Sequence, residues 1–421
     1  MKKITLIFTV ILIGSLAAHG NIGTTPAYGE SGNSITFWNK IVTEYGLENK
    51  LSPPRLARAY TLTHVAAHDA LLEAKNFNQY RSTDSQEAIV SGAISEVLIY
   101  LFPEKSVAIK DIALQTFEKN MNDKTLTSFE FGQSVGKQVV SYAKNDGSDA
   151  VFSRTIPTGD CKWRGTNPLE PTAGQWKTMI ISSGNEIQPL LPEPCDSEKY
   201  KEQIKEIVNA SQNRTEEQIK IIHYWGDTPP PTLWNNILSK QVQENKINLF
   251  DAARAYAYLN VGMYDAGVST WNAKFTHWTE RPFEIIPGFV SEIPTPNFPA
   301  YVSGHSAFSG SASIILSEIF PIEKKYFEDQ AKEANMSRIW GGLHLRQDCD
   351  EGMALGNKVG SKVIDDMRQK DHPFIYEQNS TDSTDDEFGT TLYVTIFGVM
   401  GFIVAGIMII RLKRRGLKHD Q

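Results

Sequence analysis

The chain of 421 residues is long enough for two or three ordinary domains, or for one large body built from two halves. Its hydrophobic residues (41%) and charged residues (22%) lie near the globular average, which excludes a wholly disordered chain and a multi-span membrane protein. The net charge of -7 argues against a nucleic-acid partner, because that role requires a basic surface. Any anion-binding site must therefore be locally basic.

Residues 1–20 have the pattern of a secretory signal peptide. Lys2 and Lys3 precede an apolar run from Ile4 to Ala18, and small residues follow. The cleavage site is not a clean Ala-x-Ala, so an uncleaved amino-terminal anchor is the alternative. Both interpretations predict an exported chain.

An internal repeat indicates two related helical halves. The segment ARAYTLTHVAAHDA at 57–70 resembles ARAYAYLNVGMYDA at 253–266, and both have the small and apolar residues that a buried helix requires. A chance match is the alternative. Segments 87–100, 105–117 and 130–144 also show helical spacing of apolar residues, and no run alternates like a strand. The sequence therefore predicts an all-α fold.

The predicted first helical bundle spans 33–155 and the second spans 236–370, with a Pro- and Trp-rich connector at 156–235. Cys161 and Cys195 both lie in Pro-rich parts of this connector and could form a disulfide in an exported protein. Cys349 is expected to be packed in the core. Neither the number nor the spacing of the cysteines resembles a zinc site.

Two basic residues open the chemically informative region. Lys274 and Arg281 are seven residues apart, so on one helix they project from the same face and their charges converge. Pro282 is expected to mark the end of that helix. Such a pair is more often an ordinary solvated surface.

A second motif, Ser303-Gly304-His305, precedes an apolar run that is expected to be a helix. Free N–H groups and the positive end of the dipole favour an oxyanion at a helix start. His305 would then stand beside the anion as an acid or base. The alternative is an ordinary N-cap serine with an incidental histidine.

The third motif contains Arg338, His344 and Asp348. His344 and Asp348 are four residues apart and are expected to be neighbours on one helical face. A carboxylate beside an imidazole fixes its tautomer and leaves the other ring nitrogen for a metal or an electrophile. Arg338 supplies a planar cation suited to oxyanions. A surface pair is the alternative for the histidine and the aspartate.

The carboxyl-terminal region predicts a membrane anchor. An acidic linker (371–390) precedes a predicted transmembrane helix (391–411), in which the stretch 392–410 carries no charged side chain and approximately spans the ~30 Å hydrocarbon core. The basic tail at 412–421 places the carboxyl terminus inside. The catalytic domain is therefore expected outside the cell, anchored in the cell membrane by one helix, although a buried core helix is the alternative.

Together the three motifs, K-x6-R-P, S-G-H and S-R-x5-H-x3-D, resemble the signature of the type 2 phosphatidic acid phosphatase (PAP2) and vanadium haloperoxidase superfamily. Val302 stands where the superfamily usually has proline. The segments PNFPAYVSGHSAFSG and MYDAGVSTWNAKF resemble the chloroperoxidase branch. The resemblance as a whole extends from about Pro53 to about Asp366. This resemblance implies two related four-helix-bundle halves in one chain.

The resemblance also implies a role for each motif residue. A vanadate cofactor would be bound through its oxygens by Lys274, Arg281, Ser303, Gly304 and Arg338. His344 would be the protein ligand to vanadium, with Asp348 behind it, and His305 would be the acid-base residue. In the phosphatases of the superfamily, His344 would attack phosphorus and His305 would protonate the leaving group.

Two aromatic residues favour the oxidase within this superfamily. Trp271 and Phe298 match the apolar halide pocket of the chloroperoxidase pattern, although both could simply pack in the core. The first hypothesis is a haloperoxidase that uses hydrogen peroxide and halide. The alternative is a membrane-anchored acid phosphatase that cleaves a phosphoester through phospho-His344. A third hypothesis is a non-catalytic surface protein that binds oxyanions.

Overall fold

The computed structural model describes residues 33–369 and 372–375. The predicted signal peptide, transmembrane helix and basic tail lie outside the described residues, as does most of the acidic linker. Among the helices within 33–369, none combines the length and the apolar character that a membrane span requires.

The described part of the chain is helical and contains no strand, which confirms the all-α prediction. The first half consists of α1 (Ser34–Glu48), α2 (Pro53–Ala74), α3 (Thr83–Leu101), α4 (Ser106–Gln115) and α5 (Asp123–Ala143). The second half consists of α8 (Pro230–Glu244), α9 (Leu249–His277), α10 (Pro282–Ile285), α11 (Gly304–Ile319), α12 (Lys324–Trp340) and α13 (Arg346–Gln369). Short 3-10 turns lie at η2 (Asn78–Tyr80), η3 (Pro103–Lys105), η4 (Glu118–Asn120), η5 (Ala173–Gln175) and η6 (Pro321–Glu323).

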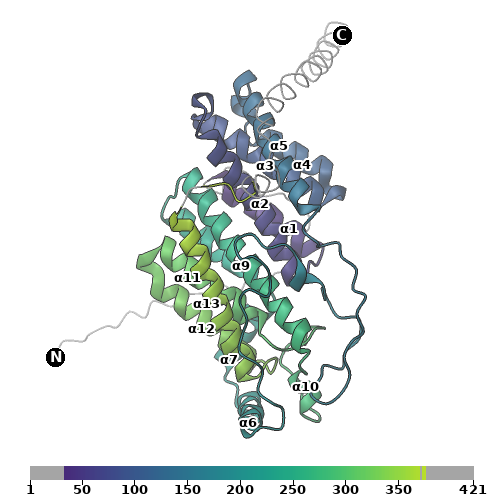
Figure 1. Cartoon of the computed structure of the whole chain (residues 1–421). Helices are drawn as coiled ribbons and strands as arrows, with labels where there is room; N and C mark the ends of the chain where they lie inside the picture. Colours follow the sequence, from purple (N-terminus) through teal and green to yellow (C-terminus); the bar gives the residue numbers. More distant parts are fainter. Residues whose placement is uncertain (1–32, 370–371, 376–421) are drawn as a thin grey trace, which may run out of the picture.

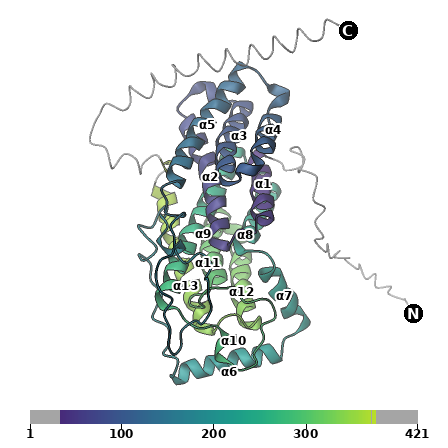
Figure 2. The ribbon, with the colours of Figure 1, turned by 90° about the vertical axis from the view of Figure 1, so that its right-hand side faces the viewer.

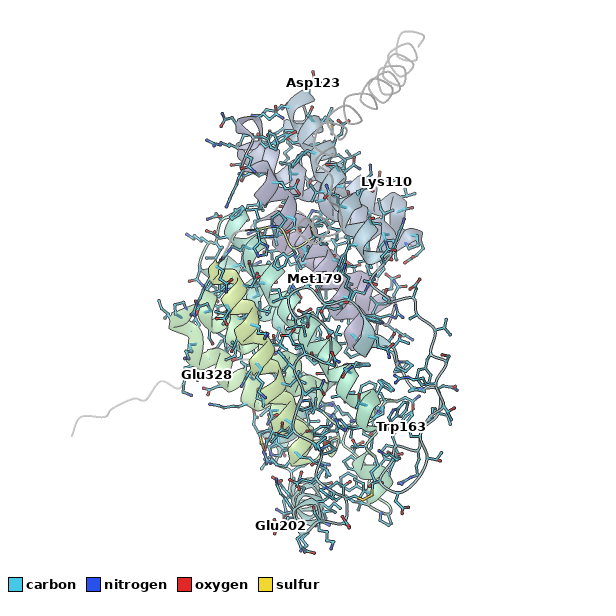
Figure 3. The ribbon with its side chains drawn as sticks, viewed as in Figure 1. Lys110, Asp123, Trp163, Met179, Glu202 and Glu328 are labelled. Carbon is cyan, nitrogen blue, oxygen red and sulfur yellow. A yellow bond between two sulfur atoms is a disulfide. The ribbon has the colours of Figure 1, made fainter. Side chains whose placement is uncertain are left out.

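The two halves lie end to end in an elongated body (Figures 1 and 2). Helices α3, α4 and α5 form one end, whereas α6 (Glu198–Gln212) and α10 lie at the other end. Lys110 and Asp123 mark the first end in Figure 3, and Glu202 of α6 marks the opposite end. The long helices α2 and α9 pack against each other where the halves meet.

The repeated segments of the sequence occupy equivalent places in α2 and α9. Asp69 of α2 accepts hydrogen bonds from the backbone N–H groups of Phe374 (3.0 Å) and Ile375 (3.2 Å), which follow α13. Asp265 of α9 accepts three such bonds, at 2.9 to 3.1 Å, from residues 179–181 in the connector after α5. Each aspartate therefore fastens the segment that follows the last helix of the other half.

Small residues allow the helix pairs α3·α5 and α11·α13 to approach closely. A Cβ added at Gly136 of α5 would lie 2.4 Å from the Ala93 carbonyl oxygen, and one at Gly356 of α13 would lie 2.1 Å from that of Ala307. Such distances leave no room for a side chain. The close packing of α11 on α13 places the start of α11 against the start of α13.

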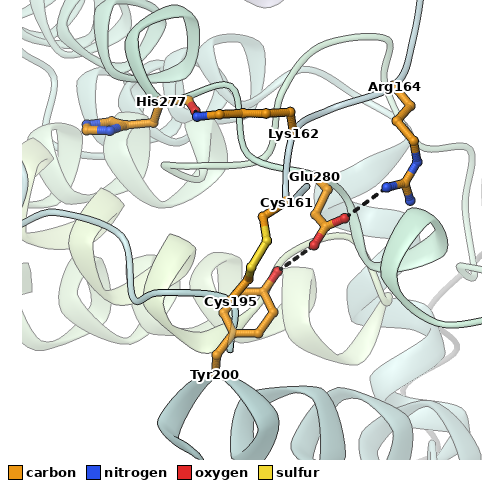
Figure 4. The surroundings of a disulfide bond; sticks show 7 residues. All are labelled: Cys161, Lys162, Arg164, Cys195, Tyr200, His277 and Glu280. Atoms are coloured by element: carbon orange, nitrogen blue, oxygen red, sulfur yellow. Dashed lines mark hydrogen bonds and ion pairs between the residues drawn. A yellow bond between two sulfur atoms is a disulfide. The ribbon is translucent and has the colours of Figure 1, made fainter. Parts of the chain in front are cut away.

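The connector is more structured than the predicted loop, because it contains α6 and α7 (Glu216–Gly226). Helix α8 begins at Pro230, before the predicted boundary at 236, because proline is well tolerated in the first turn of a helix. The predicted disulfide between Cys161 and Cys195 is confirmed, with Cα atoms 6.2 Å apart (Figure 4). The Trp163 N–H donates to the Trp278 carbonyl (2.8 Å), so this part of the connector lies along the chain that follows α9.

Candidate active site

Lys274 and Arg281 meet in the core, but they do not share one helical face. Trp278 adopts a left-handed conformation (φ 54°) and ends α9 after His277, so the prediction of a continuous helix is wrong. Pro282 begins α10 and does not end the preceding helix. The extended residues before Pro282 turn the Arg281 side chain back toward Lys274.

Both side chains bind one short segment, residues 298–300. The Lys274 ammonium donates to the carbonyls of Pro299 (3.0 Å) and Ala300 (2.8 Å). The Arg281 Nε–H donates to the Phe298 carbonyl (2.9 Å). These bonds fix the two cations side by side through the backbone of a single loop.

His344 and Asp348 are in contact, although α13 begins only at Arg346. The prediction of a shared helical face is therefore wrong, while the predicted pairing is present. Asp348 Oδ2 accepts from His344 Nδ1 (3.2 Å) and from the Leu345 N–H (3.1 Å). A carboxylate only accepts, so the neutral ring carries its proton on Nδ1.

The second ring nitrogen of His344 faces the cations. Its Nε2 lies 3.0 Å from Arg281 Nη1, and a guanidinium only donates, so Nε2 presents a lone pair. Burial, and then the nearby charge of Arg281, holds the pKa of His344 well below its ordinary value. His344 is therefore a neutral imidazole whose unprotonated nitrogen faces the Arg281 guanidinium.

The three cations of the site are buried, and the two guanidinium groups among them are incompletely paired. Lys274, Arg281 and Arg338 are 0%, 0% and 2% exposed. Arg281 Nη2, Arg338 Nε and Arg338 Nη1 are buried without a hydrogen-bond partner. Each such orphaned donor costs about 1–3 kcal/mol, so an acceptor supplied by a ligand would be strongly favoured.

Burial also lowers the proton affinity of the three cations. It lowers the pKa of Arg281 to about 10 and that of Arg338 to about 9, and it holds the pKa of Lys274 well below its ordinary value. Burial raises the pKa of the facing Asp348 to about 6, against the opposing charge of Lys274. The positive charges exceed that of this carboxylate, and the imbalance fits an anionic ligand.

Ser303 and Gly304 lie at the start of the 16-residue helix α11, as predicted. The Ser303 hydroxyl caps the helix by accepting from the Ser306 N–H (3.3 Å). The backbone N–H of Ser303 donates to the Asp348 carbonyl (2.7 Å). The ordinary N-cap interpretation is thus correct and compatible with anion binding. The helix start is fastened directly to the residue behind His344.

His305 lies within the electrostatic influence of the three cations, at the start of α11. Its Nε2 lies 2.8 Å from the Trp225 carbonyl oxygen, which only accepts, so the neutral ring carries its proton on Nε2 and its lone pair on Nδ1. Burial and the charge of Arg338 hold the pKa of His305 well below its ordinary value. The His305 residue is of intermediate exposure, whereas His344 is buried.

Trp271 and Phe298 pack against each other beside the cations. Their ring centroids are 5.1 Å apart, and Lys274 Nζ lies 5.0 Å from the Phe298 ring and 5.9 Å from the Trp271 ring. Arg281 Cζ lies 5.1 Å from the Phe298 ring. The aromatic pair is therefore both core packing and a cation–π wall of the site.

Sequence reasoning missed Trp225 and Gly226 at the end of α7. The Trp225 carbonyl binds His305, and a Cβ added at Gly226 would lie 3.5 Å from Arg338 Nη1. The segment HYWGDTPPPTLW at 223–234 is rich in aromatic residues and proline, but this composition gives no sign that the Trp225 carbonyl reaches a histidine 80 positions later.

The donor set suits an oxyanion better than a directly coordinated metal cation. Within the residues that the structure describes, no cluster of His, Cys, Asp and Glu could hold a metal ion. The site offers instead guanidinium N–H groups, a hydroxyl, a helix start and one imidazole lone pair. Vanadate fits these donors because its oxygens accept hydrogen bonds and its central atom accepts one nitrogen ligand.

The helical fold gathers buried cations, a helix start and a histidine lone pair at one site, a set of groups suited to an oxyanion. A family model described as the second helical-bundle domain of VCPO matches residues 319–371, which include Arg338, His344 and Asp348. A comparison with curated protein sequences finds no match.

Solved structures of bacterial vanadium enzymes have the same fold. A bacterial vanadium-dependent iodoperoxidase aligns with a TM-score of 0.69 and 23% identity over 79% of this chain and 95% of that chain. A holo-type bacterial vanadium-dependent chloroperoxidase aligns with a TM-score of 0.63 and 14% identity over 82% of this chain and 96% of that one. An apo-type bacterial vanadium-dependent chloroperoxidase aligns with a TM-score of 0.62 and 13% identity, over 76% of this chain and 95% of that chain.

The family-model match over residues 319–371 and the shared fold agree with the resemblance to the vanadium haloperoxidase/PAP2-like superfamily that the signature predicts. Both iodoperoxidase and chloroperoxidase structures share the fold, so the proposed chloroperoxidase-like branch stays a prediction.

Proposed function

We propose that this chain is a vanadate-dependent haloperoxidase that oxidises a halide with hydrogen peroxide. The observation that carries the proposal is the neutral His344 imidazole, whose Nε2 lone pair faces Arg281 at 3.0 Å within a cluster of buried, incompletely paired cations. The names of the structurally similar bacterial enzymes support the same activity.

The residues divide between holding the cofactor and orienting its ligand. Vanadate oxygens would be bound by Lys274, Arg281, Arg338, Ser303 and the Gly304 N–H. His344 Nε2 would ligate vanadium, while Asp348 holds the other ring nitrogen. Bound vanadate would supply the Lewis-acidic centre at which peroxide becomes reactive toward halide.

The remaining roles belong to His305 and the aromatic pair. His305 Nδ1 has the lone pair of the neutral ring, so this atom would take a proton from incoming hydrogen peroxide and later return it. Trp271 and Phe298 would keep water from one side of the cavity and give the halide an apolar wall.

A phosphatase is the second candidate, and one observation favours it. A histidine whose Nε2 is unprotonated and held among cations is also suited to attack phosphorus. Vanadate and a phosphoryl group in its transition state present the same oxygens to the same donors. The two activities therefore have to be separated by assay.

The decisive assay compares both reactions on one preparation of the full-length chain. After incubation with orthovanadate, the chain should halogenate monochlorodimedone or oxidise iodide only when hydrogen peroxide is present. His344→Ala should abolish this activity. Turnover of p-nitrophenyl phosphate that vanadate inhibits, without halogenation, would establish the phosphatase. If the chain binds vanadate but catalyses neither reaction, it is a non-catalytic oxyanion-binding protein.

We also propose that the chain is exported and anchored in the cell membrane with its catalytic domain outside. The Cys161–Cys195 disulfide supports an oxidising compartment. Cell fractionation with surface proteolysis tests this proposal. The protein should sediment with membranes and be cleaved by protease added to intact cells; recovery in the cytosol would refute it.

A further inference from the structure

The carboxyl end of helix α7 forms a wall of the site that none of the three motifs contains. The Trp225 carbonyl accepts from His305 Nε2 (2.8 Å), and the next residue, Gly226, lies over Arg338. A Cβ at Gly226 would also lie 2.2 Å from Ile293 Cδ1, so a larger residue here would require the Ile293 side chain to shift.

The Trp225 side chain anchors this end of α7 to α12. The residue is completely buried, and its indole N–H donates to Glu333 Oε1 at 2.9 Å. Glu333 lies on the same helix as Arg338, a little more than one turn before it. The carboxylate of Glu333 thus couples the carbonyl that binds His305 to the helix that carries a cation of the site.

We propose that Trp225 and Glu333 are positioning residues that hold His305 in one orientation and one tautomer. The inference rests on the proposed function, in which His305 moves a proton. Because the Trp225 carbonyl fixes the proton on Nε2, it is Nδ1 that must exchange a proton with the reactant. Without the Glu333 anchor, this carbonyl could move away and the ring could turn.

The chain offers a matched control in Trp234. This tryptophan is also completely buried, and its indole N–H donates to Ser309 Oγ at the same 2.9 Å. Its ring packs against that of Trp225, with centroids 5.9 Å apart. Trp225→Phe and Trp234→Phe therefore remove similar hydrogen bonds from one core, but the indole bond of Trp234 ends on Ser309 of α11 and not on Glu333. Within the part of the chain that the structure describes, no hydrogen bond joins Trp234 to the His305 ring.

The test uses the full-length chain and two independent readouts. Trp225→Phe and Glu333→Ala should lower kcat of the vanadate-loaded protein between about 10- and 100-fold and leave its vanadate affinity unchanged. Glu333→Gln keeps an acceptor oxygen and should restore most of kcat. Trp234→Phe should reduce thermal stability as Trp225→Phe does, with kcat within about twofold of the native value.

Nitrogen-15 NMR of the histidine rings provides the readout that does not depend on activity. In the anion-free native chain the His305 signals, assigned by their loss in His305→Gln, should show protonated Nε2 and unprotonated Nδ1. Trp225→Phe and Glu333→Ala should give signals averaged between the two tautomers, whereas Trp234→Phe should not.

Native tautomer signals in Trp225→Phe, or equal averaging in Trp234→Phe, would overturn the proposal. A chain that catalyses neither reaction would refute the proposed function, and the NMR result would still decide the positioning role.

Discussion

Replacing Asp348 by asparagine removes charge from behind His344 while preserving side-chain shape. Asp348 Oδ2 accepts from His344 Nδ1 (3.2 Å) and the Leu345 N–H (3.1 Å), and one amide oxygen can still accept both bonds. What is lost is the charge assistance to the imidazole, and this loss lowers the affinity of Nε2 for the central atom of the anion. The loss is expected to outweigh the removal of a negative charge near Lys274. Second-sphere changes of this kind typically reduce metal affinity or activity by about 10- to 100-fold, or roughly 1.4–2.7 kcal/mol.

The expected result for Asp348→Asn is a vanadate dissociation constant raised by that factor, measured by isothermal titration calorimetry, with a near-native circular dichroism spectrum. The matched control is Asp350→Asn, two residues further along α13, where the side chain is 56% exposed. The control should bind vanadate as the native chain does. Equal affinities for native chain and Asp348→Asn would refute the view that this carboxylate supports His344.

Further predictions concern stability and packing. Burial lowers the pKa of His64 to about 3. Below pH 6.5 the folded chain therefore binds fewer protons than the unfolded chain, and acidification lowers its free energy of unfolding. In urea titrations the native chain should lose about 1.4 kcal/mol per pH unit relative to His64→Gln. Replacing both Cys161 and Cys195 by serine opens a loop with a sequence separation of 34 and should cost roughly 4 kcal/mol in calorimetric unfolding. A Cβ in Gly352→Ala would meet the Ser303 carbonyl oxygen at 2.6 Å, so both thermal stability and vanadate affinity should fall, the former by about 1–3 kcal/mol.

Each of these results has a contrary outcome. A pH-independent difference between native chain and His64→Gln would mean that His64 titrates normally when folded. Equal stability of the oxidised chain and the double serine variant would mean that the disulfide does not constrain the connector. Gly360→Ala is the control for Gly352→Ala, because its Cβ would meet the Ser311 carbonyl at 2.9 Å, further along α11. It should lose stability and keep its anion affinity; equal loss of affinity would contradict a local effect at Ser303.

The sequence predicts which residues gather at the site better than it predicts how they are held there. Small and charged residues at fixed spacing identified Lys274, Arg281, Arg338 and His344, which the structure brings together. The prediction of one helix through Lys274 and Arg281 was wrong because Trp278 ends α9 in a left-handed conformation. Nothing about a tryptophan side chain predicts that conformation. Tertiary contacts, including the two carbonyl bonds of Lys274, override the helical spacing.

The helical halves were predictable from periodicity and from the repeat, because buried helices need apolar residues at regular spacing. The connector was harder to predict. Helices α6 and α7 are short, and α7 contributes a backbone carbonyl, which any residue possesses. Sequence patterns report side chains, so a contact made by the Trp225 main chain to His305 leaves no trace in residue identity.

We expect one oxyanion to lie between the buried cations, with its central atom bound to His344. A crystal structure of the vanadate-soaked chain, with anomalous scattering to locate vanadium, tests it most directly. The expected result is one vanadium at bonding distance from His344 Nε2, with its oxygens on Arg281 and Arg338. A vanadium site elsewhere, or none in this cavity at saturating vanadate, would contradict the claim.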